Sequence, residues 1–372
     1  MTIASPEICE EKTMLPTEKR WEVAPPIPVE IDQELSQFPR LLRQLLYNRG
    51  ISTTKAAILF LEGQSPEDGN PLQLKSMPEA VARLRRAIST HEPIAIYGDY
   101  DVDGVTATAL LVQVLRSLDA DVREYIPNRF EEGYGVNKDA LSSLHETGVK
   151  LVVTVDCGMR SASEANHARS LGLDMIITDH HLPGERLPDA HAIVNPNCPG
   201  DLFPSKSLAG VGVMFYLLGV VRRNLRERGW FGRARPEPNL AQFLDLVALG
   251  TVADLVPLDR NNRILVRQGL ERIRRALTRP GLMALLRLGG RDYRHASAAD
   301  LGFAVGPRLN AAGRLEDMAA GIRCLLEEDP DEAARLAGQL DELNRQRQEM
   351  QEQMQGDAMR QVQTLQAELA ER

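Results

Sequence analysis

The chain has 372 residues, of which 43% are hydrophobic and 26% are charged, and these proportions are ordinary for a globular protein with at least one large core. It contains no run of about 18 apolar residues, so the sequence offers no transmembrane helix and we expect no membrane association. Its 44 basic and 52 acidic residues give a net charge of −8 (44 − 52). This excludes a strongly basic protein but not a local basic patch that binds phosphate.

The N-terminal segment and the cysteines indicate the cellular compartment. Residues 1–30 are polar, acidic and rich in proline, without the basic and then apolar profile of a signal peptide, and they predict a disordered tail. Cys9, Cys157, Cys198 and Cys324 lie far apart, with no C-x-x-C pair. This spacing disfavours a zinc ribbon or a disulfide framework, and we expect a protein of the reducing cytoplasm.

The middle of the chain alternates between two kinds of pattern. Helical apolar spacing over 36–52 and 76–90 predicts two helices, the second with Pro78 near its start. From residue 91, short apolar strands alternate with amphipathic helices. The predicted strands are PIAIY, DVREYIP, KLVVTV, DMIIT and AHAIVNPN, and the helices between them are VTATALLVQVLRSL, NKDALSSLHETG and SASEANHARSLG. This alternation predicts an α/β fold with a doubly wound, mainly parallel sheet.

The last third of the chain is predicted to be helical. From about Ser207 the pattern is mostly that of helices, and the chain finishes on a long polar helix without aromatic residues. We therefore predict a tail over 1–30, one domain over 31–325 and a long connecting helix over 326–372. Within the domain, we expect helices over 31–90, the sheet over 91–200 and further helices over 201–325.

Acidic and histidine side chains follow three of the predicted strands at the points where the strands end. They are Asp99, Asp101 and Asp103 after PIAIY, Asp156 after KLVVTV, and Asp179, His180 and His181 after DMIIT. Because the carboxyl ends of parallel strands meet at one edge of a sheet, we expect these side chains to converge. Acids held so close together repel one another unless a cation lies between them.

The ligand types in this cluster narrow the choice of metal. Carboxylates with one or two imidazoles, and no thiolate, suit Mn²⁺ or Mg²⁺ better than structural zinc. Adjacent side chains diverge from an extended backbone, so we expect one of His180 and His181 to bind metal while the other faces substrate. Asp156 taken alone could equally cap the next helix, as could Ser161 or Ser163, and the sequence leaves these two roles open.

Another acid lies in the apolar stretch FLDLVALGTVADLVPL. Asp254 is flanked there by Ala253 and Leu255, with Asp245 earlier in the same stretch. A lone buried carboxylate costs several kcal/mol unless it is paired or bound to metal. Asp254 is therefore either a further metal ligand, which we expect, or an acid at the helix end that pairs with a nearby arginine.

Three arginine-containing stretches are candidates for binding an anion. VGPRLNAAGRLED predicts a loop in which Arg308, Asn310 and Arg314 face an anion, or else a turn whose arginines pair with Glu316 and Asp317. IPNRFEEGYG adds Arg129 and Tyr134 beside the same edge of the sheet. RRNLRERGWFGRAR places six arginines around Trp230 and Phe231, either as a surface for single-stranded nucleic acid or as a solvated loop.

Five of these motifs occur in the order and approximate spacing found in DHH-family phosphoesterases: GDYDVDG, VDCG, TDHH, GTVADLVPL and GPRLNAAGR. Over residues 41–341 the chain most closely resembles the single-strand-specific 5′-exonucleases of that family. The resemblance implies that two Mn²⁺ or Mg²⁺ ions are held by Asp99, Asp101, Asp103, Asp156, His180 and Asp254. It implies catalytic roles for His181, Asp156 and Asp101 and substrate binding by Arg129, Arg308, Asn310 and Arg314.

The resemblance also implies an activity. It is 5′→3′ hydrolysis of single-stranded DNA in repair and recombination, with His181 on the scissile phosphate and with a helicase and a single-strand-binding protein as candidate partners. Two cations can lower the pKa of a shared water and neutralise phosphate charge. The alternatives are a phosphoesterase for short oligonucleotides, cyclic dinucleotides or pyrophosphate, and a non-catalytic replisome scaffold, which the presence of every candidate ligand disfavours.

Two departures from the family pattern carry expectations of their own. Tyr97 stands where many relatives have a histidine ligand, and Asp99 would replace that ligand. The exonucleases of the family continue past a long helix into a second domain, called DHHA1, and an OB fold, whereas this sequence finishes on the helix. We therefore expect weak strand binding, slow turnover and a helix that is protease-sensitive beyond about Arg347.

Overall fold

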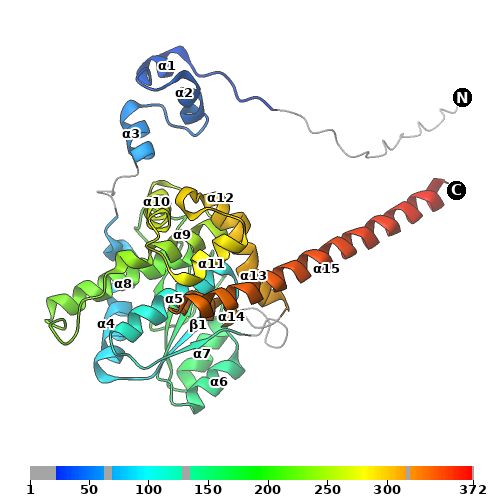
Figure 1. Ribbon diagram of the computed structural model, residues 1–372. Helices are drawn as coiled ribbons and strands as arrows, with labels where there is room; N and C mark the ends of the chain where they lie inside the picture. The colour runs from blue at the N-terminus through cyan, green and yellow to red at the C-terminus, as the bar shows by residue number, and fades with distance from the viewer. Residues whose placement is uncertain (1–21, 63–68, 128–134, 316–318, 371–372) are drawn as a thin grey trace, which may run out of the picture. The chain divides into compact units, whose positions relative to one another are not determined.

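The computed structural model describes residues 22–62, 69–127, 135–315 and 319–370, and the chain divides into two compact units, residues 1–62 and 63–372. The described part of the first unit contains α1 (Val29–Glu34), α2 (Arg40–Tyr47) and α3 (Thr54–Glu62) around a small core (Figure 1). The sequence predicts a single domain from residue 31, whereas the structure groups residues 31–62 apart from the sheet. The domain boundaries themselves remain predictions.

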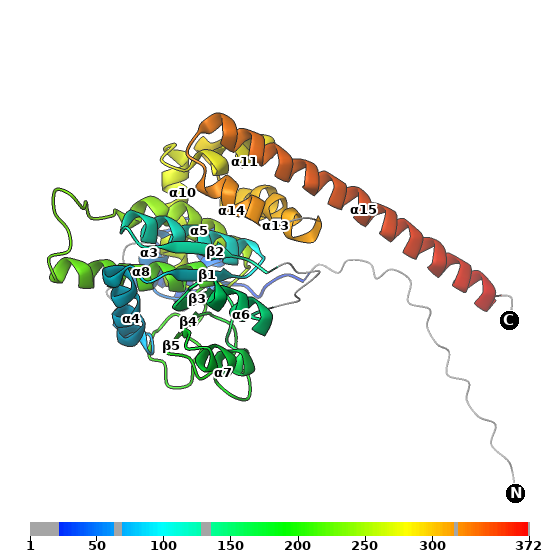
Figure 2. The same cartoon turned by 90° about the horizontal axis from the view of Figure 1, so that it is seen from below.

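The second unit is built on a sheet of five parallel strands. They are β1 (Ile94–Gly98), β2 (Val122–Tyr125), β3 (Leu151–Val155), β4 (Asp174–Thr178) and β5 (Ala192–Val194). Their order across the sheet is β2-β1-β3-β4-β5 (Figure 2). Ile94 lies opposite both Val122 and Leu151. The direction of chain progression reverses between β1 and β3, and ligands of doubly wound sheets bind at this switch point.

Helices cover both faces of the sheet, which confirms the doubly wound α/β prediction. Ile94 and Ile96 face a core shared with α4 (Met77–Thr90), α5 (Val102–Ser117) and α8 (Gly210–Glu227). Ala95 and Tyr97, which alternate with them along β1, face α6 (Lys138–Glu146) and α7 (Ala162–Ser170). The central strands β1 and β3 are buried along their whole length, as continuous apolar runs predict.

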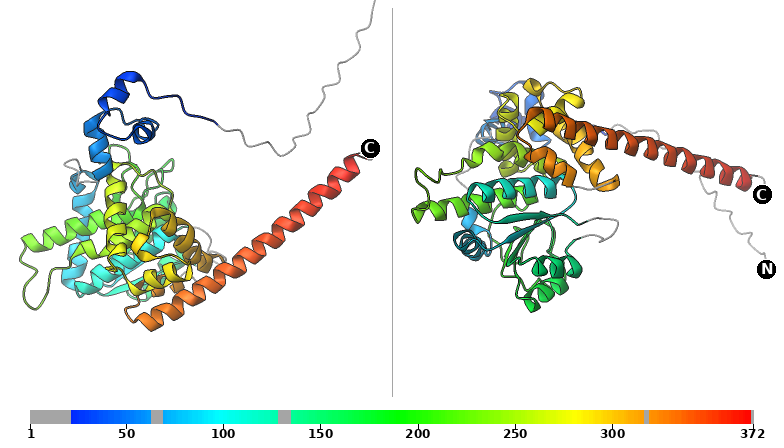
Figure 3. Two further views of the ribbon diagram at one scale, coloured as in Figure 1. Left: turned by 45° about the horizontal axis from the view of Figure 1, so that its top comes forward. Right: turned by 60° about the horizontal axis from the view of Figure 1, so that its bottom comes forward.

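The rest of the second unit is helical, as predicted. Three short 3-10 helices occur in this unit: η1 (Pro71–Gln73), η2 (Leu240–Phe243) and η3 (Tyr293–His295). The remaining helices, in chain order, are α9 (Leu244–Ala253), α10 (Arg260–Arg274), α11 (Pro280–Leu288), α12 (Ala298–Asp300), the π-helix η4 (Leu301–Val305), α13 (Gly306–Leu315), α14 (Ala319–Leu326) and α15 (Pro330–Ala370). Helix α15 packs its first turns on α11 and α13, and its later part extends away from them (Figure 3). The residues from 348 onward whose burial is described are exposed, apart from the half-buried Gly356. No helix within the described ranges has both the length and the apolar character needed to cross a membrane.

The predicted loop in VGPRLNAAGRLED is wrong, because the described part of this segment, residues 305–315, is helical. Helix α13 begins at Gly306 and continues directly from the π-helix η4. Pro307 lacks an N–H group and cannot continue a regular ladder of helix hydrogen bonds, but the wider π-helix turn before it accommodates this defect. Leu309, Ala311 and Ala312 are buried, so packing of an apolar face outweighs the turn-forming tendency of the glycines and the proline.

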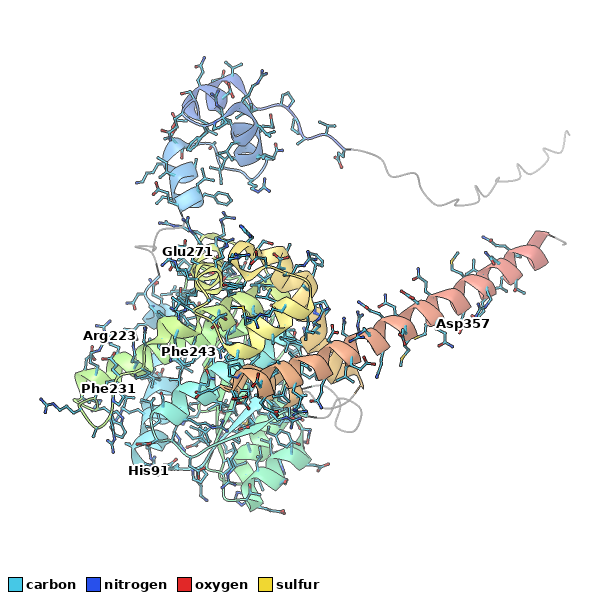
Figure 4. All side chains as sticks on the ribbon, in the orientation of Figure 1. His91, Arg223, Phe231, Phe243, Glu271 and Asp357 are labelled. Carbon is cyan, nitrogen blue, oxygen red and sulfur yellow. The ribbon has the colours of Figure 1, made fainter. Side chains whose placement is uncertain are left out.

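We predict that Asp245→Asn lowers the free energy of unfolding by about 3–5 kcal/mol. The Asp245 carboxylate is fully buried in α9 and lies 3.0 Å from the Arg279 guanidinium, and it also accepts a 2.7 Å hydrogen bond from Thr278. The substitution leaves the guanidinium without its counter-charge. Urea unfolding curves measure the change, with Asp357→Asn on the exposed half of α15 as a control that should unfold like the parent (Figure 4).

Candidate metal and phosphate site

The candidate residues lie at the carboxyl ends of β1, β3 and β4, so the predicted convergence is confirmed. Asp99 directly follows β1 and Asp156 directly follows β3, which are the strands of the switch point. Asp101 caps α5 by accepting a 3.0 Å hydrogen bond from the Gly104 N–H. Asp103 is fully buried in the first turn of the same helix.

The N-terminus of α8 closes on these acids through its backbone. The Gly210 and Val211 N–H groups donate hydrogen bonds of 2.5 and 2.9 Å to the two carboxylate oxygens of Asp103. A Cβ atom at Gly210 would lie 2.8 Å from both the Cβ and Oδ1 atoms of Asp156, so only glycine permits this approach. Helix N-termini favour anions, so these two hydrogen bonds offset part of the burial and repulsion that raise the pKa of Asp103.

Asp156 occupies a left-handed backbone conformation immediately after β3. Its φ is +62°, and its N–H donates a 2.9 Å hydrogen bond to the Thr178 carbonyl. The next helix, α7, begins at Ala162 with Ser161 in the capping position, so the helix-capping role for Asp156 is wrong. Non-glycine residues in this conformation cluster at functional sites, and here the turn directs Asp156 toward the other acids.

Four atoms suited to metal coordination are buried in this cluster, and none has a hydrogen-bond partner within the described part of the chain: Asp99 Oδ1, Asp156 Oδ1, His180 Nε2 and Asp254 Oδ2. His180 Nε2 lies 3.0 Å from Asp156 Oδ1, 3.4 Å from Asp254 Oδ2 and 3.8 Å from Asp103 Oδ2. Buried polar atoms without partners are costly, and this set of oxygens with one imidazole nitrogen fits Mn²⁺ or Mg²⁺.

Ligand atoms of the candidate residues form three groups whose members lie within 4.8 Å of one another. The groups are Asp156 with His180 and His181, Asp103 with His180 and Asp254, and Asp99 with Asp101 and Asp156. Asp254 is the residue at which α9 ends, and no arginine partner accounts for it in the described structure. The arrangement can therefore hold more than one cation.

Burial and mutual repulsion make the charged forms of these acids unfavourable without a cation. Burial and then Asp101 raise the pKa of both Asp99 and Asp254 from an ordinary 3.8 to about 7. Burial and neighbouring carboxylates also raise the pKa values of Asp103 and Asp156 well above the usual range. A divalent cation supplies the missing positive charge.

We predict that the metal-free protein becomes less stable as pH rises from about 4 to about 7. The folded state keeps protons on Asp99 and Asp254 that the unfolded state has released, so stability falls across this window. His180 makes stability rise with pH in this window, because burial lowers its pKa to about 4. The effect of this one histidine is smaller than the combined effect of the acids. Melting temperatures measured in chelator and in Mn²⁺ at pH 5 and pH 8 should show a larger Mn²⁺ effect at pH 8. The pH-dependent fall should shrink in Asp254→Asn, and an equal fall in both proteins would contradict the assignment.

Asp179 holds His181 in one orientation, a role that the sequence did not reveal. Its Oδ1 lies 2.8 Å from His181 Nδ1 and also accepts the N–H groups of His180 and His181, at 2.7 and 3.0 Å. The hydrogen bond that His181 donates to Asp179 raises the pKa of His181 to about 9, so the ring is cationic at neutral pH. An acid two residues before a histidine at a strand end is the available sequence signal.

The two adjacent histidines differ in exposure as well as in charge. The His180 side chain is 11% exposed and points to the buried acids, whereas that of His181 is 45% exposed. Their ring centroids are 4.5 Å apart. His181 lines a cavity of about 390 Å³ together with Val136, Met159, Arg160 and Ser161. His181 can therefore meet a phosphate at the mouth of the site, and His180 can serve as a ligand.

The candidate substrate-binding residues are only partly brought to this edge. The Arg308 guanidinium lies 2.8 Å from Asp341 Oδ1 and donates to the Ala304 carbonyl, so a carboxylate already pairs with it. Asn310 lines a hollow of about 200 Å³ that also contains Ala253, next to Asp254. Arg129 and Tyr134 lie outside the described residues, as do Glu316, Asp317 and the side chain of Arg314.

Several arginines of the arginine-rich stretch after residue 221 contact nearby side chains of the same region. Arg222 and Arg226 both lie at ion-pair distance from Glu237, and the Arg235 guanidinium stacks 4.6 Å from the Trp230 ring centroid. Figure 4 shows Phe231 in the loop beyond the end of α8. Two arginines of α8 and one of the following loop thus already have partners nearby in the chain.

Comparison with known proteins points to one family. Residues 93–251 match the family model described as "DHH family, N-terminal domain". The chain is 49% identical over 326 residues to the single-stranded-DNA-specific exonuclease RecJ of Escherichia coli K12, covering 87% of this chain and 56% of that protein. It therefore spans little more than half the length of this curated relative.

Solved structures give the same result. The crystal structure of exonuclease RecJ bound to manganese is 38% identical, with a TM-score of 0.69 over 77% of this chain and 70% of that one. The Mn²⁺ complex of RecJ from Thermus thermophilus is 33% identical, with a TM-score of 0.72 over 87% of this chain and 44% of that one. A Mg²⁺ complex of the same protein also matches.

Proposed function

Because this chain belongs to the DHH family, we propose that it hydrolyses phosphodiester bonds of single-stranded DNA from the 5′ end, with two Mn²⁺ or Mg²⁺ ions. The single observation that carries the proposal is the set of buried ligand atoms without partners at the switch point of the sheet. The ions would be held by Asp99, Asp101, Asp103, Asp156, His180 and Asp254. When bound, such ions activate water and neutralise charge on the phosphate oxygens.

The protein's own groups supply orientation and positive charge. Asp179 keeps His181 protonated and fixes its Nδ1, which leaves the other ring nitrogen free to donate to a phosphate oxygen. The N-terminus of α8 orients the Asp103 carboxylate through two backbone hydrogen bonds. In this scheme Asp156 and Asp101 position the reacting water, and His181 contacts the scissile phosphate.

Substrate length separates this proposal from its main alternative. The 390 Å³ cavity beside His181 has room for one nucleotide, which also suits a phosphoesterase for short oligonucleotides or cyclic dinucleotides. We expect faster Mn²⁺-dependent release of 5′ mononucleotides from long 5′-phosphorylated single strands than cleavage of dinucleotides. Duplex DNA should be cleaved much more slowly than single strands.

The test uses the purified chain with 3′-labelled strands in Mn²⁺, in Mg²⁺ and in chelator. Asp156→Asn prepared in the same way controls for contaminating nuclease. Cleavage no greater than in this control would refute the proposal, and a preference for dinucleotides would replace it with the small-substrate reaction.

We also propose a cytoplasmic location, with a helicase and a single-strand-binding protein as partners, since such an enzyme needs single strands to be produced and kept open. A DHHA1 domain after α15 likewise remains a prediction. It rests on the family resemblance alone.

A further inference from the structure

Phe303 is an unusual surface residue. Its side chain is 79% exposed, and among the described residues it is the only Phe, Trp or Tyr side chain that is largely exposed. It lies in η4, a π-helix, and short π-helical segments are frequent at functional sites. The neighbouring position packs tightly, because a Cβ atom at Gly302 would lie 3.3 Å from the Val252 side chain. The backbone of η4 is therefore held against the end of α9 while Phe303 stays uncovered.

A hollow lies between η4, which carries Phe303, and α9, the helix that ends at Asp254. Gly302 and Gly306 line it, together with Pro307, Asn310, Ala253 and Arg347, and its volume is about 200 Å³. Ala253 immediately precedes Asp254, whose Oδ2 lies 3.4 Å from His180 Nε2. One residue of its lining is therefore the chain neighbour of a candidate metal ligand.

Arg347 differs from the other arginines at the start of α15. Its guanidinium donates only to amide oxygens, those of Asn344 at 3.2 and 3.3 Å and Gln351 at 3.1 Å, and no carboxylate pairs with it in the described structure. By contrast, Arg308 and Arg345 both bind Asp341. Arg347 thus brings an unneutralised positive charge to the hollow. A guanidinium held by neutral amides is suited to a phosphate oxygen.

We propose that Phe303 and Arg347 form a contact site for single-stranded DNA, in which a base stacks on Phe303 and a backbone phosphate binds Arg347. This inference rests on the proposed function and extends it to two residues outside the metal cluster. Stacking on an aromatic ring accepts any base, which suits an enzyme that must progress along all sequences. A phosphate contact from Arg347 compensates locally for the net charge of −8.

The experiment measures binding without cleavage. The full chain is titrated in chelator with a fluorescent oligothymidylate of about 12 nucleotides and with an abasic strand of equal length. Phe303→Ala should weaken oligothymidylate binding about 5- to 150-fold and leave abasic binding unchanged, and Phe303→Trp should restore affinity. Arg347→Ala should weaken both and reduce the slope of log affinity against log salt by about 0.7, whereas Arg345→Ala, at a carboxylate-paired position, should not.

The outcomes separate this inference from the proposed activity. Parent-level oligothymidylate affinity in Phe303→Ala, or an unchanged salt slope in Arg347→Ala, overturns the contact site even if the parent cleaves DNA. A parent that binds with the predicted variant pattern but does not cleave in Mn²⁺ refutes the activity and keeps the site. A parent that binds neither strand overturns the site. Both changed side chains reach the surface, and unchanged melting temperatures confirm that the variants fold.

Discussion

Replacing Asp156 by asparagine is expected to reduce Mn²⁺-dependent turnover about a thousand-fold or more, because several kcal/mol of charge stabilisation depend on the bound ions. Asp156 Oδ1 lies 3.0 Å from His180 Nε2 and belongs to two of the three candidate ligand groups. Asparagine tolerates the left-handed backbone that residue 156 adopts, so the fold should survive. Single-turnover cleavage and calorimetric Mn²⁺ titration measure the two losses.

Thermal melting of the same variant provides the control for misfolding. Burial and repulsion from Asp103 disfavour the Asp156 carboxylate in the metal-free protein. Asp156→Asn should therefore melt at a higher temperature than the parent in chelator, yet gain less from Mn²⁺. Retained Mn²⁺ affinity with parent-level cleavage would remove Asp156 from the site.

His181→Ala should lower turnover about a hundred- to a thousand-fold while Mn²⁺ affinity changes less than about tenfold. His181 is the more exposed histidine and carries a positive charge at neutral pH through Asp179. Its loss removes a charged hydrogen-bond donor to phosphate but leaves the buried atoms of the cluster. Calorimetry gives metal affinity, and cleavage under saturating strand gives turnover.

His180→Ala is the matched comparison and should lose metal as well as activity, because its Nε2 faces three acids. If His181→Ala loses metal and His180→Ala keeps it, the two roles are reversed. Asp179→Asn adds a further check. Without the acid the pKa of His181 falls from about 9, so the alkaline limb of the pH–rate profile should move to lower pH.

The sheet and the position of the acids could be predicted because both depend on local patterns. Apolar runs such as LVVTV form buried strands, and parallel strands bring their carboxyl ends to one edge. Asp99, Asp156 and His180 follow such runs closely, so their convergence needs no knowledge of side-chain packing. The metal chemistry then follows from the ligand types.

The sequence-based predictions fail where contacts between residues far apart in the chain determine the local structure or the partner of a side chain. Glycine and proline in GPRLNAAGR suggest a loop, but burial of Leu309, Ala311 and Ala312 stabilises a helix there. Arg308 appears free of acids in the sequence because its partner, Asp341, is 33 residues away. The sequence marks Asp179 only as one more acid in the cluster, and the hydrogen-bond geometry is needed to reveal that it orients His181.

The closure of α8 on the acid cluster determines when during folding the site forms. The hydrogen bonds from Gly210 and Val211 to Asp103 join residues 107 and 108 positions apart, so they require closure of a long loop. Contacts of this kind tend to form after local helices. We therefore expect the cluster to assemble after the main folding barrier, so that bound Mn²⁺ leaves the refolding rate unchanged but slows unfolding. Bound metal would then raise the kinetic stability of the folded domain by slowing its unfolding.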